Sequence, residues 1–488
     1  MKYVGGVVVV AAVGAAGYGI YQATLPSPTT PTLTPTPTPT PTPTGTPTPT
    51  PTPTMTGPPP SEDPMLFDMW AAQPELVGGY LKTFNEQYNE NAKLEVVSNY
   101  YPVIETKYFA GNPADMHYTH PHTAQRYYSA GWLRNVDDLV KSEINPYDIK
   151  DIKAELADSN YKWLEAYTTK DGKLTSLPYC QDTRGAMLTN EKLLEKVGLS
   201  GVYPETYEEL YDNVRKLKNA GFKESYMPHW YLHPFHGICW GWLQEVYARG
   251  KEYEEMFDKN ADPTFDTNTV AADVLKDWKK LREEDLAPSW IYSVGDEGSL
   301  IGGMASGHYA YSSQLSQMVW HMNDPARNAN FPGYCSIVPP KKHGWGCLDG
   351  CGYGMTNKKR TPYKLERLKR WMTFMGYKDK NGEYLTEIGW LTKSRYFVCS
   401  CYKKVNLSEA VREVWRPFLF REEDHDTIAL DLLETAYAPP VWKEFWYMDW
   451  QLKVIETLPV FLEGKITLEE TIKTLRDSVT EYKKLYGG

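Results

Sequence analysis

Two clusters of histidine have the residue type and spacing best suited to chemistry. They follow HxxHxH and HxxxHxxH patterns: His117, His120, His122, His229, His233 and His236. Imidazole nitrogens bind Zn²⁺ and other transition metals, so metal capture is one hypothesis for this protein. Pro121 and Pro234 interrupt the helical spacing, so the histidines of one cluster need not share a helix face. Hydrogen bonding to hydroxyl groups is the alternative role, and we favour it.

Side chains suited to sugars form a second group. Aromatic rings cover the apolar CH faces of a sugar, while Asp, Asn, Gln and His bond its hydroxyl groups. The chain has 36 Tyr, 16 Trp and 14 Phe. The densest aromatic run spans residues 227–236 and is followed by Trp240 and Trp242. We expect Trp230 and Tyr231 of this run to contact a ligand.

The elements that must position these residues begin with strand–helix alternation. Apolar runs at 65–70, 94–97 and 115–118 are typical of strands, and residues 76–88 and 103–110 between them are typical of helices. Such alternation predicts a parallel sheet covered by helices. Parallel sheets bind ligands at the carboxyl ends of their strands. The candidates at or just after those ends are Trp70, Gln73, His117, Tyr118, Thr119 and His120.

Alternation continues through the rest of the chain. Residues 173–178 and 185–188 are typical of strands, and 190–197, 207–220 and 270–284 of helices. The last predicted helix starts with a capping box at Thr467 and Glu470, in which two side chains satisfy free backbone amides reciprocally. No repeat of fixed period is present.

Length, charge and motifs exclude several classes of function. The 488 residues indicate two to four domains or lobes, and a net charge of -10 argues against a general affinity for nucleic acid. The sequence has no P-loop, GxSxG or HExxH motif and no recognisable pair of catalytic carboxylates. We therefore predict that the protein is not an enzyme and needs no cofactor.

Seven cysteines raise the question of disulfide bonds. Cys347 and Cys351 form a CxxxC pair in a Gly-rich stretch, which could close a small disulfide loop outside the cell. A metal site would need a second CxxC partner pair, which the sequence lacks. The alternative is seven buried, inert thiols.

The first 63 residues predict where the protein acts. Residues 4–20 are almost entirely apolar or Gly and follow Lys2, so they could cross a bilayer with the N-terminus inside. A cleaved secretory signal peptide is an alternative. Residues 2–6 resemble the archaeal pilin-type signal, which gives a third interpretation of this segment. No Cys follows the apolar run, which excludes a bacterial lipoprotein anchor.

Residues 26–60 are nearly alternating Thr and Pro. Such a chain cannot bury a core and stays extended, reaching roughly 100 Å at 3.1 Å per residue. This composition is also typical of an O-glycosylated stalk. We predict a membrane anchor at 1–25, a disordered stalk at 26–63 and an extracellular binding domain at 64–488.

Four short motifs in order connect the binding domain to a known family. They lie at residues 109–115 with 130–133 and 136–139, at 171–178 with 188–190 and 204–210, at 304–310, and at 444–447. Together they resemble the extracellular solute-binding proteins of ABC importers, in the sugar-binding group that includes maltodextrin-binding protein. The resemblance covers essentially all of residues 65–488.

The resemblance implies a two-lobe α/β fold with a hinge and a central cleft. It implies chain crossings near 177–181 and 337–340, and a carbohydrate, in particular an oligosaccharide, delivered to a membrane permease. Trp446 matches a family position whose Trp stacks on sugar, whereas Ser313 and Gln314 replace aromatic residues of maltodextrin-binding protein. The further candidates near the crossings are Tyr179, Gln181, Asp182 and Trp345.

Other functions stay open at the level of sequence. A zinc-binding importer subunit would use the histidine clusters, and a pilin-like filament subunit would use the N-terminal apolar helix. A glycerol-phosphate compound or a peptide is an alternative ligand.

Overall fold

The computed structural model describes residues 57–70, 73–234, 236–250, 256–295, 297–340, 344–394 and 398–486. The predicted anchor at 4–20 and the Thr-Pro stretch up to residue 56 lie outside this part of the chain. Among the described residues, no helix combines the length and apolarity needed to cross a bilayer.

The N-terminal part of the fold follows the predicted β-α-β-α-β order. Its elements are β1 (Met65–Trp70), α2 (Pro74–Tyr88), β2 (Ala92–Val97), α3 (Tyr100–Phe109) and β3 (Met116–Thr119). β1 pairs in parallel with both β2 and β3, so the predicted parallel arrangement is confirmed. β3 therefore ends at Thr119, and the HxxHxH histidines lie in this strand and directly after it.

All described strands belong to one nine-stranded sheet with the order β2-β1-β3-β8-β4-β6-β5, in which β7 and β9 also pair with β4. The remaining strands are β4 (Leu177–Asn190), β5 (Tyr226–Met227), β6 (Tyr311–Leu315), β7 (Cys335–Ile337), β8 (Cys347–Met355) and β9 (Cys399–Ser400). Of the predicted extended stretches, 185–188 lies within β4, whereas 173–178 overlaps it only at Leu177 and Pro178.

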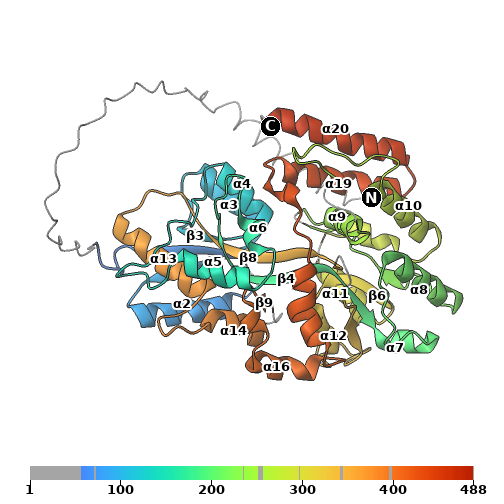
Figure 1. The fold of residues 1–488 in the computed structure, drawn as a ribbon, viewed down its shortest axis with the longest axis horizontal. Coiled ribbons are helices and arrows are strands. Elements are labelled where there is room, and N and C mark those ends of the chain that lie inside the picture. The colour runs from blue at the N-terminus through green and yellow to red at the C-terminus, as the bar shows by residue number, and fades with distance from the viewer. Residues whose placement is uncertain are drawn as a thin grey trace.

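Two long antiparallel strands, β4 and β8, join the two parts of the molecule (Figure 1). β8 pairs with β3 at one end, and β4 pairs with β6 and β7 at the other. We call the part around β1–β3 the first lobe and the part around β5–β7 the second lobe. The crossing predicted near 177–181 coincides with the start of β4, and residues 337–340 follow β7 on the way to β8.

Helices surround the sheet in both lobes (Figure 1). In the first lobe they include α4 (Pro121–Ser129), α5 (Ile149–Asp158), α6 (Trp163–Tyr167), α13 (Pro362–Gly376) and α14 (Leu385–Thr392). In the second lobe they include α7 (Glu191–Leu194), α8 (Tyr207–Asn219), α9 (Ile238–Ala248), α10 (Val270–Glu283), α11 (Glu297–Ala305), α12 (Met318–Asn323), α19 (Tyr447–Leu462) and α20 (Leu468–Tyr486). Shorter helices are α15 (Lys403–Asn406), α16 (Glu409–Trp415), α17 (Asp424–Asp426) and α18 (Leu432–Thr435).

Local sequence signals explain where α20 begins. The backbone N–H of Glu470 donates to Thr467 Oγ1 at 3.1 Å, and the N–H of Thr467 donates to Glu470 Oε2 at 2.8 Å. This reciprocal pair confirms the predicted capping box. Ile472, Leu475 and Val479 of the same helix are buried at helical spacing, so its apolar stripe faces the core.

A bulge in β4 matters for the site described below. The pairing of β4 with β6 shifts between Arg184 and Ala186, and Gly185 between them has φ +87°. A side chain at this position would also collide with the amide of Gln244. Glycine is therefore required here, and the bulge turns the strand next to Arg184.

The structure overturns the predicted Cys347–Cys351 loop. In the structure none of the seven cysteines is bonded to another, and Cys347 and Cys351 both lie in β8. Four residues of an extended strand separate their Cα atoms by about 13 Å. A disulfide spans at most about 7 Å between Cα atoms, so these two residues cannot be bridged.

Candidate ligand-binding site

A buried polar network joins the two lobes beside the carboxyl end of β3. His120 Nδ1 lies 3.4 Å from Asp349 Oδ1, and Asp349 Oδ2 accepts hydrogen bonds from Arg184 Nε and Nη2, both at 2.7 Å. Arg184 Nη1 donates to Tyr231 Oη at 2.6 Å, which lies 2.6 Å from His236 Nδ1. The network runs from the first lobe, through β8 and β4, to the segment after β5 in the second lobe.

The charges in this network support one another. Burial favours a neutral carboxyl, but the Arg184 guanidinium and His120 outweigh it and hold the pKa of Asp349 well below its usual range. Burial favours a neutral imidazole, but the neighbouring Asp349 carboxylate outweighs burial and raises the pKa of His120. Nearby, burial raises the pKa of Asp182 to about 7, against hydrogen bonds from Ser316 and the Thr183 amide. Asp349 is therefore a carboxylate held between the Arg184 guanidinium and the His120 ring.

Aromatic rings from both lobes pack around the network. His233 and His236 stack with ring centroids 3.7 Å apart, and His122 of α4 meets the edge of Trp240 of α9 at 5.6 Å. Trp442, in the turn of Pro440–Lys443, lies 4.8 Å from Trp240. Trp240 and Trp442 are each 1% exposed, so these rings form a buried aromatic cluster.

The two histidine clusters, separate in sequence, therefore meet in space. Burial lowers the pKa of His229 and of His233 to about 3, and it lowers the pKa of His122 and of His236 well below the usual value. These four rings are neutral at neutral pH. Within the described ranges, no group of three or more His, Cys, Asp or Glu side chains is arranged to hold a metal ion.

Five of the predicted site residues lie in or beside the network. His120 and Tyr231 belong to it, and Tyr118 Oη lies 2.7 Å from His120 Nε2. Asp182 stands directly across from Asp349 in the β4–β8 pairing. Trp70, at the end of β1, is 46% exposed, and its ring centroid lies 6.3 Å from that of Tyr118.

Two predicted glutamines have buried polar atoms that need partners. Neither amide atom of Gln181 has a hydrogen-bond partner in the described part of the chain, and Gln314 Nε2 also has none there. Both side chains are buried. A buried amide without a hydrogen-bond partner costs free energy. Binding of a ligand or water that supplied such a partner would therefore be favoured.

The other predicted residues make contacts away from the network. His117 bonds Tyr108 at 2.7 Å, Gln73 donates to Ser394 at 2.6 Å, Thr119 donates to the Gly352 carbonyl at 3.0 Å and Tyr179 stacks on Tyr353 at 4.1 Å. Trp230 packs on Trp278 at 5.2 Å, Trp345 donates to the Pro339 carbonyl at 3.1 Å and Trp446 packs on Phe257 at 5.9 Å. A ligand role for these residues stays a prediction, and their described contacts are structural.

Sequence reasoning missed Arg184 and Asp349, the central ion pair. A usable signal existed, because each is a charged residue inside a stretch that is otherwise apolar, small or uncharged: residues 183–188 and 346–355. Charged residues are rarely fully buried unless they are paired. A charge in a buried strand therefore indicates a partner that only the fold can identify.

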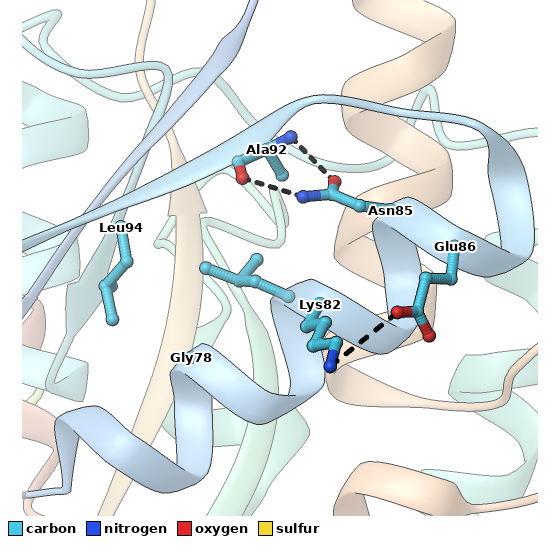
Figure 2. A pocket seen from close by; sticks show the side chains of 7 residues that line it. Gly78, Lys82, Asn85, Glu86, Ala92 and Leu94 are labelled. Carbon is cyan, nitrogen blue, oxygen red and sulfur yellow. Dashed lines mark hydrogen bonds and ion pairs between the residues drawn. The ribbon is translucent and has the colours of Figure 1, made fainter.

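The hollow between α2 and β2 is a different place (Figure 2). Its lining includes Lys82 and Glu86, an ion pair at 3.9 Å with both side chains mostly exposed, and Asn85, which bonds the backbone of Ala92. None of its lining residues belongs to the network. The Asn85 contacts hold the helix to the edge strand, whereas the Lys82–Glu86 pair lies within the helix, so the hollow offers no distinctive chemistry.

The buried His117 predicts a measurable pH dependence of stability. Burial lowers the pKa of His117 from 6.5 to about 4. The folded-state pKa is below the unfolded one, so this stabilising contribution is full above pH 6.5 and is lost as pH falls towards 4. Between pH 6.5 and pH 4 the free energy of unfolding falls by about 3 kcal/mol through this residue. His117→Gln should therefore lose less stability than the wild type between pH 7 and pH 4.5, as measured by urea unfolding. Parallel curves for the two proteins would contradict this assignment.

Comparison with known proteins agrees with this architecture. A family model described as bacterial extracellular solute-binding protein matches residues 71–325. No curated protein sequence matches the chain. Among solved structures, maltose-bound MalE3 of T. maritima is 16% identical with a TM-score of 0.65, and the two are aligned over 86% of this chain and 99% of that one.

Two other solved structures are similar at the same level. A solute-binding protein of an ABC transporter from Thermotoga lettingae, bound with alpha-D-tagatose, is 17% identical with a TM-score of 0.63. UgpB from Mycobacterium tuberculosis, in complex with glycerophosphocholine, is 14% identical with a TM-score of 0.64. Each alignment covers 86% of this chain and 99% of the other.

At identities this low, the structural similarity shows the two-lobe fold alone. The family model, in contrast, matches more than half of the chain. Members of this family act outside the cytoplasm and bind substrates without catalysing a reaction. The chain therefore belongs to the bacterial extracellular solute-binding protein family and is a solute-binding protein of the ABC-transporter type.

Proposed function

We propose that this protein captures a carbohydrate, in particular an oligosaccharide, between its lobes and delivers it to the membrane subunits of an ABC importer. The observation that carries the proposal is the network of His120, Asp349, Arg184 and Tyr231 between the lobes. It lies beside the carboxyl end of a parallel strand, where this kind of sheet binds ligands. Sugar hydroxyl groups can both donate to Asp349 and accept from Arg184.

Aromatic surface beside the network supports a sugar over a purely polar solute. Trp70 is 46% exposed, and its ring lies beside Tyr118, which contacts His120 of the network. Rings stack on the apolar faces of sugars, and buried amides such as Gln181 match sugar hydroxyl groups. Similar structures were solved with maltose and with tagatose, which agrees with this chemistry.

Closure of the lobes would follow from the same contacts. β4 and β8 connect the lobes, so bending within these strands is the simplest hinge. A ligand that contacts His120 in the first lobe and Tyr231 in the second stabilises only the closed arrangement. Binding therefore shifts the population towards the closed form.

The test is thermal unfolding of the protein with mono-, di- and oligosaccharides, with glycerophosphocholine, and with Zn²⁺ before and after EDTA. A ligand at 100 times its Kd stabilises the fold by about 2.7 kcal/mol, which raises Tm measurably. We expect a rise with one class of sugar. A rise with glycerophosphocholine alone, or with Zn²⁺ alone and reversed by EDTA, would refute the carbohydrate assignment.

The sequence also supports a proposal about attachment. We propose that residues 4–20 anchor the protein in the membrane and that the Thr-Pro stretch up to residue 63 spaces the binding domain from it. The apolar run beside Lys2 and the Thr-Pro composition support this. Fractionation of cells that make the full chain checks it, since recovery in the soluble extracellular fraction alone would contradict an anchor.

A further inference from the structure

Two cysteines face each other on the strands that connect the lobes. In the antiparallel pairing of β4 with β8, Cys180 is directly opposite Cys351. Opposed residues of such a pair have Cα atoms about 4.5–5.5 Å apart. A disulfide usually spans about 4.4–6.8 Å between Cα atoms, so this pair can be bridged without moving the backbone.

The other described cysteines near this point are less well placed. On its other side β4 pairs with β9, where Cys180 is opposite Ser400 and Cys399 is opposite Gln181. Cys399 is thus one position away along the strand, and neighbouring side chains point to opposite faces. Cys351 is the only thiol in a described strand that directly opposes Cys180.

The local chemistry favours Cys351 as the first thiol to react. Cys351 is half-buried, whereas Cys180 is buried. Burial raises the pKa of Cys351, but a hydrogen bond with Cys180 and the charge of His120 outweigh it, so the net pKa is lowered. The thiolate is the reactive form of cysteine, and Cys180 lies against it as the resolving thiol.

We propose that Cys180 and Cys351 form a disulfide between β4 and β8 once the protein is outside the cytoplasm. The oxidant is a disulfide-bearing donor. The Cys351 thiolate attacks one sulfur of the donor and displaces the other as a thiolate. The Cys180 thiol then loses its proton and attacks Cys351 sulfur, releasing the second donor thiol. Two cysteine thiols are oxidised and one donor disulfide is reduced to two thiols.

This bond would connect the hinge to the candidate site. Cys351 Sγ donates to Tyr118 Oη at 3.0 Å, and Tyr118 Oη lies 2.7 Å from His120 Nε2. Oxidation removes the S–H donor, so the hydrogen bonding of Tyr118 and His120 changes with the redox state. The bond also holds β4 and β8 together at Cys180 without linking either strand to the rest of a lobe, so it leaves the far ends of the strands free to bend.

The experiment is thiol mapping of the full chain exported from cells and purified without reductant. The protein is denatured in an alkylating agent, digested and analysed by mass spectrometry, with and without prior reduction. We expect five of the seven cysteines to be alkylated before reduction, and one joined peptide pair containing Cys180 and Cys351. Alkylation of all seven before reduction, or a joined pair containing any other cysteine, would overturn the proposal.

Two variants provide matched controls. Cys351→Ser should abolish the joined peptides, whereas Cys347→Ser, on the same strand, should retain them. If Cys351→Ser does not fold, wild-type protein suffices: reduction should lower its Tm by roughly 3–8 °C, because the bond closes a long loop. An unchanged Tm on reduction would count against the bond. These readouts need no ligand, so failure of the carbohydrate assignment would leave the result unaffected.

Discussion

Replacing Asp349 by Asn is expected to destabilise the protein by about 3–5 kcal/mol, because breaking a buried ion pair leaves an uncompensated charge. Asp349 and Arg184 are 5% and 6% exposed, and two hydrogen bonds of 2.7 Å connect them. His120 would lose its carboxylate partner in the same step. Urea unfolding at pH 7, followed by circular dichroism, measures the loss.

The exposed pair of Asp273 and Lys276, 2.9 Å apart, is the matched control, since Asp273→Asn should cost less than about 1 kcal/mol. A second variant tests whether the unpaired Arg184 guanidinium causes the loss of stability. Adding Arg184→Met to Asp349→Asn removes the stranded guanidinium and should restore part of the stability. If Asp349→Asn loses as little stability as Asp273→Asn, the network contributes little to the association of the lobes.

Two tryptophans are expected to separate ligand binding from stability. Trp70 is 46% exposed beside Tyr118, whereas Trp446 is 2% exposed against Phe257. Trp70→Ala should weaken binding of the responding sugar about tenfold, with a change in stability below about 1 kcal/mol. Trp446→Ala should cost about 3–5 kcal/mol of stability, because it leaves a large cavity in the core.

Isothermal titration calorimetry and urea unfolding of both variants give the two quantities. Binding should be measured at a temperature where each variant is fully folded. If Trp446→Ala abolishes binding while its stability is unchanged, the family-based prediction of a stacking role is correct and the buried position does not exclude it. If Trp70→Ala binds like the wild type, the stacking surface lies elsewhere.

The first lobe was largely predictable because its signals are local. Apolar runs of strand length alternate with helical periodicity between Met65 and Thr119, and parallel pairing follows from that order. The capping box at Thr467 and Glu470 likewise involves residues three positions apart, so its geometry is set within one helical turn.

The cysteines show where local reasoning fails. Cys347 and Cys351 are close in sequence, and closeness in sequence suggested a loop. β8 is instead extended there, which separates the two residues, while pairing with β4 brings Cys351 opposite Cys180. Strand register depends on residues far away in the chain, so the sequence around Cys351 could not identify its neighbour.

By itself, the sequence determined the α/β class, the residues at the end of β3 and the sugar-suited composition, because periodicity, caps and side-chain chemistry are properties of short segments. Only the tertiary structure decided which of these residues meet. The pairing of β4 with β8 brings Arg184 within hydrogen-bond distance of Asp349, and the packing of the second lobe adds Tyr231 and His236. The same packing buries Trp446 and leaves Trp70 exposed. Arg184 and Asp349 are 165 residues apart in the chain, and Arg184 and Tyr231 are 47 apart, so no local pattern encodes their relative positions.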